Sequence, residues 1–274
     1  MNRNITLGQY FPGNSPLHRA DPRTKLILAF AFMILAFTAG SIYEFAALTV
    51  FVLSVITVSK ISISIMLRSV KPVLPLILFA SLLNIFMVPG EAFFRLWIIA
   101  PTHEGVVVAV RMALRVTLII LGGSSLMIFT TTPIMLTDAV ESLLKPLNRF
   151  RVPVHELAMM MSIALRFIPT LIEEADKIMR AQASRGADFN EGKLLDRARS
   201  FIPIIIPLFV SAFRRADELA NAMEARCYRG GEGRTKLRQL RFARLDAVLM
   251  TAFLALAAVF FLQRLTGGFF GYVQ

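Results

Sequence analysis

Five long apolar runs without a charged residue constrain this chain more than any other feature of its sequence. They are Leu26–Tyr43, Phe45–Ser59, Pro72–Gly90, Val116–Thr137 and Ala247–Gln263. A helix needs about 20 residues to cross the hydrocarbon core of a bilayer, which is about 30 Å thick. The first, third and fourth runs are long enough alone, and the other two need a few flanking residues. The runs therefore predict an all-α integral membrane protein with about five transmembrane helices.

A sixth uncharged run, Ser200–Phe213, is too short to be a comparable span. It contains Pro203 and Pro207, both of which disturb a regular helix. We expect this run to lie half-buried rather than to cross the membrane.

The basic residues follow the ends of the apolar runs, and their distribution predicts the topology. Lys60, Arg68 and Lys71 separate the second run from the third, whereas the connection Gly40–Glu44 has no Lys or Arg. Of the 30 Lys and Arg residues, 19 lie between positions 133 and 244. Because cytoplasmic loops are enriched in Lys and Arg, we expect a cytoplasmic N-terminus and an external C-terminus.

This topology divides the chain into three parts and explains its net charge of +12 without nucleic acid as a partner. Residues 1–131 hold the N-terminal lead and four spans, and residues 132–244 form a cytoplasmic region. Residues 245–274 hold the last span and the C-terminal tail. The partner implied by the composition is the lipid bilayer, and the location is the cytoplasmic membrane.

Local signals predict where several helices begin and end. Asp21 followed by Pro22 is a typical helix start, because Asp accepts a hydrogen bond from a free backbone N–H and Pro needs none. Thr132-Pro133 repeats the signal and opens a short amphipathic helix. A longer helix from Pro153 ends near Gly186, bent at Pro169, and a third runs from about Leu194 to Tyr228.

The two long helices of the cytoplasmic region end alike, each with one arginine among small residues. The predicted docking residues at these ends are Ala183, Ser184, Arg185, Gly186, Ala225, Arg226 and Cys227. Small residues allow another backbone to approach, and arginine offers a planar donor group that binds carboxylates or carbonyls. An arginine near a helix end can also simply complement the helix dipole, which is the alternative for either residue alone.

The chain resembles a known family, the transmembrane coupling (T) component of energy-coupling-factor transporters. The similarity runs from about Tyr10 to Thr266. It rests on four segments: Ser15-Pro16-Leu17-His18 with Asp21-Pro22-Arg23-Thr24-Lys25, Ala164-Leu165-Arg166-Phe167-Ile168-Pro169, Ala181-Gln182-Ala183-Ser184-Arg185-Gly186, and Glu224-Ala225-Arg226. The last two look like the paired Ala-Arg-Gly signatures of that family, although Cys227 replaces the second glycine.

The resemblance implies an importer of vitamins or transition metals in which this chain is not the enzyme. Two cytoplasmic ATPase subunits bind the ATP, and a membrane-embedded S component binds the substrate. Arg185 would contact one ATPase and Arg226 the other, while two long coupling helices pass their motion to the S component. The family implies no catalytic residue, bound cofactor or metal ligand in this chain.

Several enzyme classes are disfavoured by the sequence. It lacks the G-x-x-x-x-G-K-[ST] loop of ATPases. Its histidines, His18, His103 and His155, lie in three different segments without metal-ligand spacing. An intramembrane serine hydrolase using Gly122-Gly123-Ser124-Ser125 would need a basic partner, and no histidine lies in an apolar run.

A conventional ABC importer permease, lining the substrate path itself, is the main alternative. Glu173-Glu174-Ala175 faintly resembles the coupling loop of such permeases. A path for substrate also needs polar groups inside the spans. Arg111 and Arg115 are the nearest candidates, and we expect them to snorkel to the outer interface.

Overall fold

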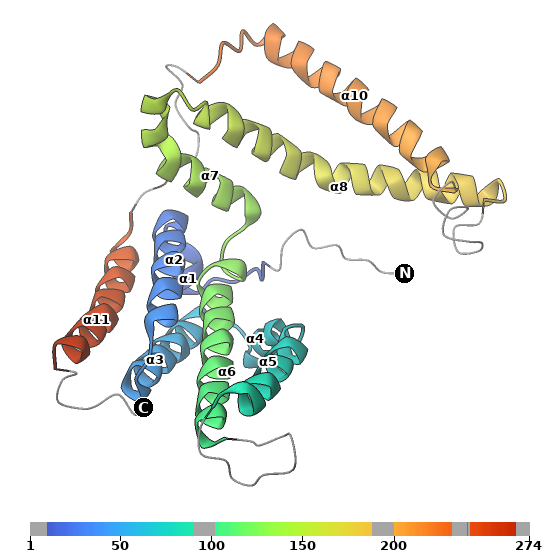
Figure 1. Ribbon diagram of the computed structural model, residues 1–274. Helices are drawn as coiled ribbons and strands as arrows, with labels where there is room; N and C mark the ends of the chain where they lie inside the picture. The colour runs from blue at the N-terminus through green and yellow to red at the C-terminus, as the bar shows by residue number, and fades with distance from the viewer. Residues whose placement is uncertain (1–9, 90–101, 188–199, 232–239, 241, 267–274) are drawn as a thin grey trace. The chain divides into compact units, whose positions relative to one another are not determined.

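The computed structural model describes residues 10–89, 102–187, 200–231, 240 and 242–266 (Figure 1). It contains two compact units. Unit 1 comprises Met1–Ala139 with Gln239–Gln274, and unit 2 comprises Val140–Arg238. Within the described residues every regular element is a helix.

Unit 1 is a bundle of helices from both ends of the sequence. Its elements are α1 (Pro16–Arg19), α2 (Pro22–Thr38), α3 (Ile42–Ser59), α4 (Ile63–Val70), α5 (Leu74–Met87), α6 (His103–Gly123), the π-helix η1 (Ser124–Ile128) and α11 (Arg244–Thr266). The helix α7 (Pro133–Leu144) extends across the boundary between the units. Unit 2 contains η2 (Lys145–Phe150), α8 (Val154–Ser184) and α10 (Ile202–Ala225).

Both predicted start signals are confirmed. The Asp21 carboxylate accepts a hydrogen bond from the Arg23 backbone N–H at 2.8 Å, and Pro22 is the first residue of α2. At the start of α7 the Thr132 hydroxyl accepts a hydrogen bond from the Met135 N–H at 3.3 Å. Pro169 lies inside α8, which continues through it as one helix of 31 residues.

The described helices agree with an integral membrane protein of about five spans. Four are long and apolar enough to cross a membrane: Ile42–Ser59, His103–Ile128, Val154–Ser184 and Arg244–Leu265. The pair α4 and α5, bent by 56°, would make a fifth if it counts as one span. Helix α2 has 17 residues, which gives it a length of about 26 Å. Helix α8 meets the same test, although the sequence predicts it as a cytoplasmic coupling helix.

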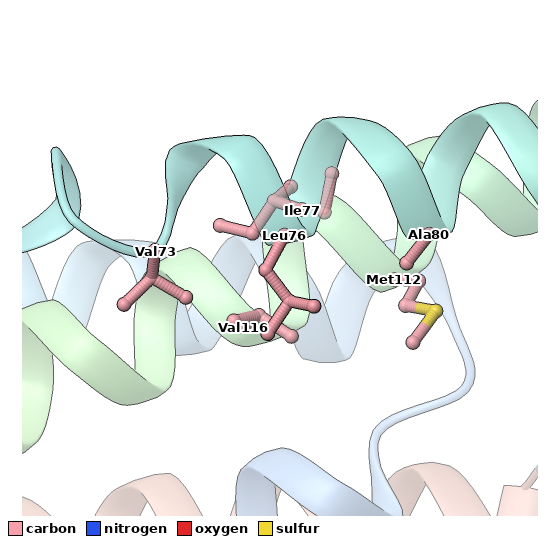
Figure 2. Close-up of a pocket in the computed structure, with 7 residues that line it drawn as sticks. Val73, Leu76, Ile77, Ala80, Met112 and Val116 are labelled. Carbon is pink, nitrogen blue, oxygen red and sulfur yellow. The ribbon is translucent and has the colours of Figure 1, made fainter.

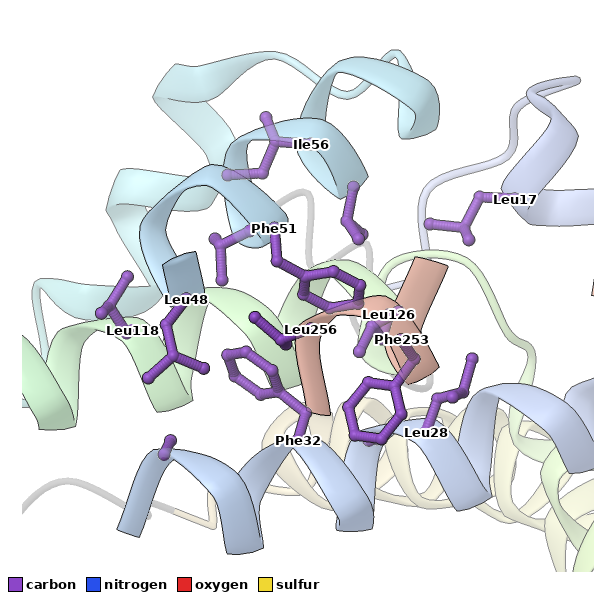
Figure 3. Packing of buried hydrophobic residues seen from close by; sticks show 14 of the residues in the cluster. Leu17, Leu28, Phe32, Leu48, Phe51, Ile56, Leu118, Leu126, Phe253 and Leu256 are labelled. Carbon is purple, nitrogen blue, oxygen red and sulfur yellow. The ribbon is translucent and has the colours of Figure 1, made fainter. Parts of the chain in front are cut away.

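The core of unit 1 is formed by α2, α3, α6, η1 and α11 (Figure 3). Phe32, Leu48 and Leu126 are completely buried there. The Phe32 and Phe51 rings stack with centroids 5.7 Å apart, and Phe253 meets Phe51 edge-on at 6.0 Å. These contacts unite helices that are distant in sequence.

Two helices differ in extent from the apolar runs of the sequence, one because it extends past charged residues and one because a local cap interrupts it. Helix α6 begins at His103, before the apolar run that starts at Val116, so Arg111 and Arg115 lie within it. The Arg115 guanidinium donates to the Ala39 carbonyl at 2.5 Å, just after α2 ends and beside the Gly40–Glu44 connection. It thus supplies a donor to a helix end whose carbonyls lack helical partners.

The first apolar run is interrupted where α2 gives way to α3. The Glu44 carboxylate accepts hydrogen bonds from the backbone N–H groups of Gly40 (2.6 Å) and Ser41 (3.0 Å). With Ser41 as N-cap this is a capping box, which starts a new helix at Ile42.

Candidate docking site on two helix tips

The α8 tip is defined by the last residues of α8 and ends in a Schellman motif. The Gly186 N–H donates to the Ala183 carbonyl, and the Ala187 N–H donates to the Gln182 carbonyl, both at 3.0 Å. Gly186 has a φ of +88°, in the left-handed region that glycine adopts without steric cost. Arg185 is therefore the C-cap residue of a tightly closed helix end.

The α10 tip repeats this arrangement position by position. The Cys227 N–H donates to the Glu224 carbonyl at 2.8 Å, and the Tyr228 N–H donates to the Met223 carbonyl at 3.0 Å. Arg226 is the C-cap residue, equivalent to Arg185. Cys227, with a φ of +54°, occupies the place of Gly186. The departure from the signature therefore changes the side chain and keeps the backbone conformation.

All seven predicted docking residues are exposed at these tips. The backbone N–H groups of each Schellman motif occupy two carbonyls of the last turn. Within the described residues, no hydrogen bond or ion pair is made by the side chains of Arg185 and Arg226. Their guanidinium donors do not serve the helix ends on which they are placed.

The structure does not bring the two tips together. Helices α8 and α10 pack as an antiparallel pair (Figure 1). Arg215 forms an ion pair with Glu174 at 2.6 Å, and the Gln182 amide reaches the Pro203 carbonyl at 3.5 Å. The α8 tip thus lies beside the start of α10, and the 24 residues of α10 separate it from the α10 tip. At a rise of 1.5 Å per residue, that separation is about 36 Å.

Comparison with known proteins gives the family. A family model described as CbiQ, cobalt transport protein, matches residues 13–237. The chain belongs to the CbiQ family. Curated relatives include the energy-coupling factor transporter transmembrane proteins EcfT of Ruminiclostridium cellulolyticum, 54% identical, and of Bacillus subtilis, 44% identical. The first alignment covers 95% of this chain and the second 96%, and each covers 100% of the relative.

A third such relative, from Acidaminococcus fermentans, is 52% identical over 93% of this chain and 95% of its own. The predicted resemblance is therefore confirmed across nearly the whole length. This CbiQ-family protein is a transmembrane component of an energy-coupling factor transporter.

The apolar halves of the two long helices are exposed in this CbiQ-family chain. In α8 only Val154 and Ala158 are buried, and in α10 only Ile204 and Ser211. The exposed large apolar residues are Leu157, Met160, Met161, Ile202, Ile205, Ile206, Phe209, Val210 and Phe213. Unit 2 therefore exposes apolar surface at the start of each long helix, at opposite ends of the antiparallel pair.

A small pocket between α5 and α6 is apolar throughout (Figure 2). It is lined by Val73, Leu76, Ile77, Ala80, Met112, Ala113 and Val116. No lining residue can hydrogen-bond a polar solute through its side chain except weakly through the Met112 sulfur. This pocket is therefore unsuited to a vitamin or a hydrated metal ion.

The sequence did not predict one polar cluster of unit 1. The sequence predicted Asp21 only as a helix cap, but its backbone N–H also donates to Asp246 of α11 at 2.7 Å. Lys25 lies buried in the same region. The contact of Asp21 with Asp246 and that of Lys25 with Thr130 leave no local sequence signal, because each joins residues more than 100 positions apart.

Proposed function

We propose that this protein is the coupling subunit of its transporter, passing ATP-driven motion from two cytoplasmic ATPases to a membrane-embedded S component. The observation that carries the proposal is the pair of matching tips on one antiparallel helix pair. Each presents an exposed C-cap arginine on a Schellman motif, about 36 Å from the other. Two equivalent donors held apart in this way suit two equivalent partners.

The chemistry of each tip favours a rigid, acidic or carbonyl-rich groove as its partner. The small residues Ala183, Ser184 and Gly186 leave the α8 backbone open to close approach. A guanidinium forms paired hydrogen bonds with a carboxylate or with carbonyls and stays charged at any physiological pH. ATP would bind to the ATPase subunits, and this chain would need neither a cofactor nor a catalytic residue.

The exposed apolar surface of unit 2 supports a second contact of the coupling helices. Phe209 and Phe213 on α10 lie with ring centroids 6.3 Å apart and are largely exposed. An S component carrying a vitamin or a transition metal ion would cover this surface within or at the edge of the bilayer. Motion of unit 2 would then reach the S component directly.

Removing both arginines tests the proposal. Charge-assisted bidentate contacts are worth roughly 1.5–3 kcal/mol, and breaking one side of a desolvated pair can cost about 2–5 kcal/mol. We expect Arg185→Ala and Arg226→Ala each to weaken capture of the ATPases, and the double variant to lose it. Pull-down of the two ATPases with the tagged chain measures this effect.

Arg180→Ala and Arg229→Ala are the matched controls, since both residues are exposed near the same tips. They should retain ATPase binding close to the wild-type level. Substituting Arg185 and Arg226 by lysine keeps the charge but removes the paired donors, so an intermediate loss is expected. Wild-type capture by the double alanine variant would refute the docking role.

The proposed orientation places the N-terminus and residues 132–244 in the cytoplasm and the C-terminus outside. Single cysteines at Gly231 and Gln274, in a chain with Cys227 replaced, should react with membrane-impermeant reagents from opposite sides. Labelling of both from one side would exclude this topology.

A further inference from the structure

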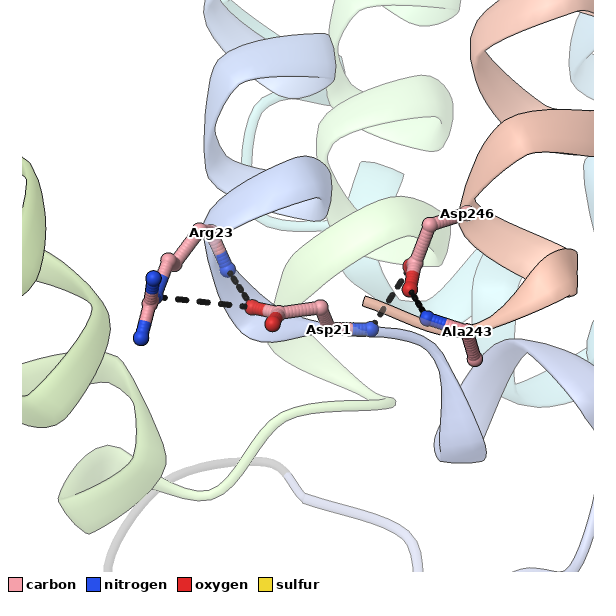
Figure 4. A network of polar contacts seen from close by, with 4 residues as sticks. All are labelled: Asp21, Arg23, Ala243 and Asp246. Carbon is pink, nitrogen blue, oxygen red and sulfur yellow. Dashed lines mark hydrogen bonds and ion pairs between the residues drawn. The ribbon is translucent and has the colours of Figure 1, made fainter. Parts of the chain in front are cut away.

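A buried charged cluster lies at one end of unit 1, where α2 and α11 begin (Figure 4). Its members are Asp21, Lys25 and Asp246, with exposed fractions of 4%, 1% and 3%. Charged residues are almost never this deeply buried unless their charges are paired. The cluster therefore needs a reason to persist in the fold.

Lys25 holds the chain where it leaves the core of unit 1. Its ammonium donates to the Thr130 carbonyl at 3.1 Å and to the Thr131 hydroxyl at 3.4 Å. The carboxylates of Asp246 and Asp21 lie near enough to favour its positive charge, although neither is within ion-pair distance of it among the described residues. Thr130 and Thr131 follow η1 after Phe129, and α7 then leads the chain to the end of unit 1 at Ala139.

Asp246 holds the chain where it returns. One carboxylate oxygen accepts from the Asp21 N–H at 2.7 Å, and the other accepts from the Ala243 N–H at 2.6 Å. Unit 1 resumes at Gln239, so Ala243 lies four residues after the re-entry. Nearby, the Arg23 guanidinium lies over the Phe242 ring at 5.9 Å.

The N-cap and the first turn of α2 thus contact the chain at Thr130 and Thr131, before unit 1 ends at Ala139, and at Asp246, soon after unit 1 resumes at Gln239. A flexible connection would absorb a displacement of unit 2, whereas a hydrogen-bonded one transmits it. Buried charge-assisted hydrogen bonds are the strongest links available for this purpose.

We propose that Asp21, Lys25 and Asp246 are positioning residues for energy coupling, which clamp the two chain connections so that motion of unit 2 reaches α2 and α11. The proposal rests on the coupling function proposed above. The three residues contact neither ATP nor transported substrate.

The test uses the complete complex of this chain with its ATPases and S component, reconstituted in lipid vesicles. Spin labels at Val50 of α3 and Val248 of α11, both exposed, report motion inside unit 1; they are attached through unnatural amino acids, so that Cys227 stays unchanged. ATP hydrolysis is measured on the same samples. In the wild-type background we expect ATP to shift the distance distribution between the labels.

Lys25→Met should leave ATPase binding and hydrolysis intact while reducing the ATP-shifted population about fivefold or more, the lower range of ordinary site-to-site coupling. Asp246→Asn should reduce it less, because one of the two accepted hydrogen bonds remains possible. Leu48→Ala removes a buried core side chain away from the connections, so it lowers thermal stability without changing the ATP-driven shift.

Wild-type shifts in both charge variants would overturn the clamp, as would an equal loss in Leu48→Ala or an absent shift in the wild-type background. If Lys25→Met does not assemble, Asp246→Asn and Thr131→Val decide by the same criterion. Failure of the docking proposal is seen separately, because it leaves ATPase capture unaffected by loss of Arg185 and Arg226.

Discussion

Helices α3 and α8 are both apolar enough to span a membrane, yet they are buried very differently. Eight of the 18 residues of α3 are buried within unit 1, against two of the 31 residues of α8 in unit 2. Apolar composition alone therefore does not reveal which helices build a core. Unit 1 buries part of its apolar surface in an internal core and exposes the rest, whereas α8 and α10 of unit 2 bury very little of theirs.

The difference matters because lipid solvates apolar side chains as well as a protein core does. Helices in a bilayer associate through packing and hydrogen bonds rather than through exclusion of water. Stability of unit 1 should therefore depend on close fit, and the role of unit 2 on its exposed residues.

The largest expected effect comes from replacing one phenylalanine in each unit by alanine. Phe32→Ala removes a fully buried ring that stacks on Phe51, and should lower the unfolding free energy by about 3 kcal/mol, the lower end for such changes because lipid replaces water. Phe209→Ala removes a ring that is 60% exposed and should change it by less than about 0.5 kcal/mol. Unfolding of the purified chain in detergent measures both. Equal losses of unfolding free energy in the two variants would contradict the difference in burial between the two units.

A second prediction tests close packing within unit 1 through two adjacent glycines of α6. A Cβ at Gly122 would overlap the Phe32 ring, whereas a Cβ at Gly123 would meet nothing within 4 Å. Gly122→Ala should therefore destabilise the chain by about 1–3 kcal/mol, the usual cost of overpacking. Gly123→Ala is the matched control and should be neutral or stabilising, since alanine favours helix. A reversed order in thermal unfolding would show that the α2–α6 contact is looser than described.

The smallest effects concern the left-handed residues of the tips in unit 2. Gly186→Ala forces a Cβ into the left-handed region and should cost about 1–2 kcal/mol in the last turn of α8. Cys227→Gly relieves the same strain and should gain less than about 1 kcal/mol in α10, because glycine loses more entropy on folding. Amide hydrogen exchange at the two helix ends measures these changes. Slower exchange after Gly186→Ala would contradict the shared Schellman geometry.

The sequence predicted helix ends better than span boundaries. Asp21, Thr132 and Gly186 act through hydrogen bonds to residues only a few positions away, so their roles could be predicted from the local sequence. Arg115 could not be placed in this way, since the Ala39 carbonyl that it binds lies 76 positions earlier. The apolar run from Val116 therefore covers only the last part of α6, which begins at His103.

At the candidate site, too, local features were predictable from the sequence and distant contacts were not. The two arginine tips were identified from short motifs, and the structure added their common Schellman geometry and their separation. The burial of Lys25 was not predictable, because the residues around its ammonium come from the segment after η1 and from the start of α11. Sequence patterns record a helix and its caps, but not which distant residues neutralise a charge.

The contact between Asp21 and Asp246 also limits when unit 1 can finish folding during synthesis. Its two residues are 225 positions apart, and all of unit 2 is synthesised between them. At about 5–20 residues per second, the ribosome reaches Asp246 roughly 10–45 s after Asp21. During that interval Lys25 lacks one of its two carboxylates, and the core lacks Phe253, Leu256 and Phe260. The core of unit 1 is therefore complete only after α11 has been synthesised.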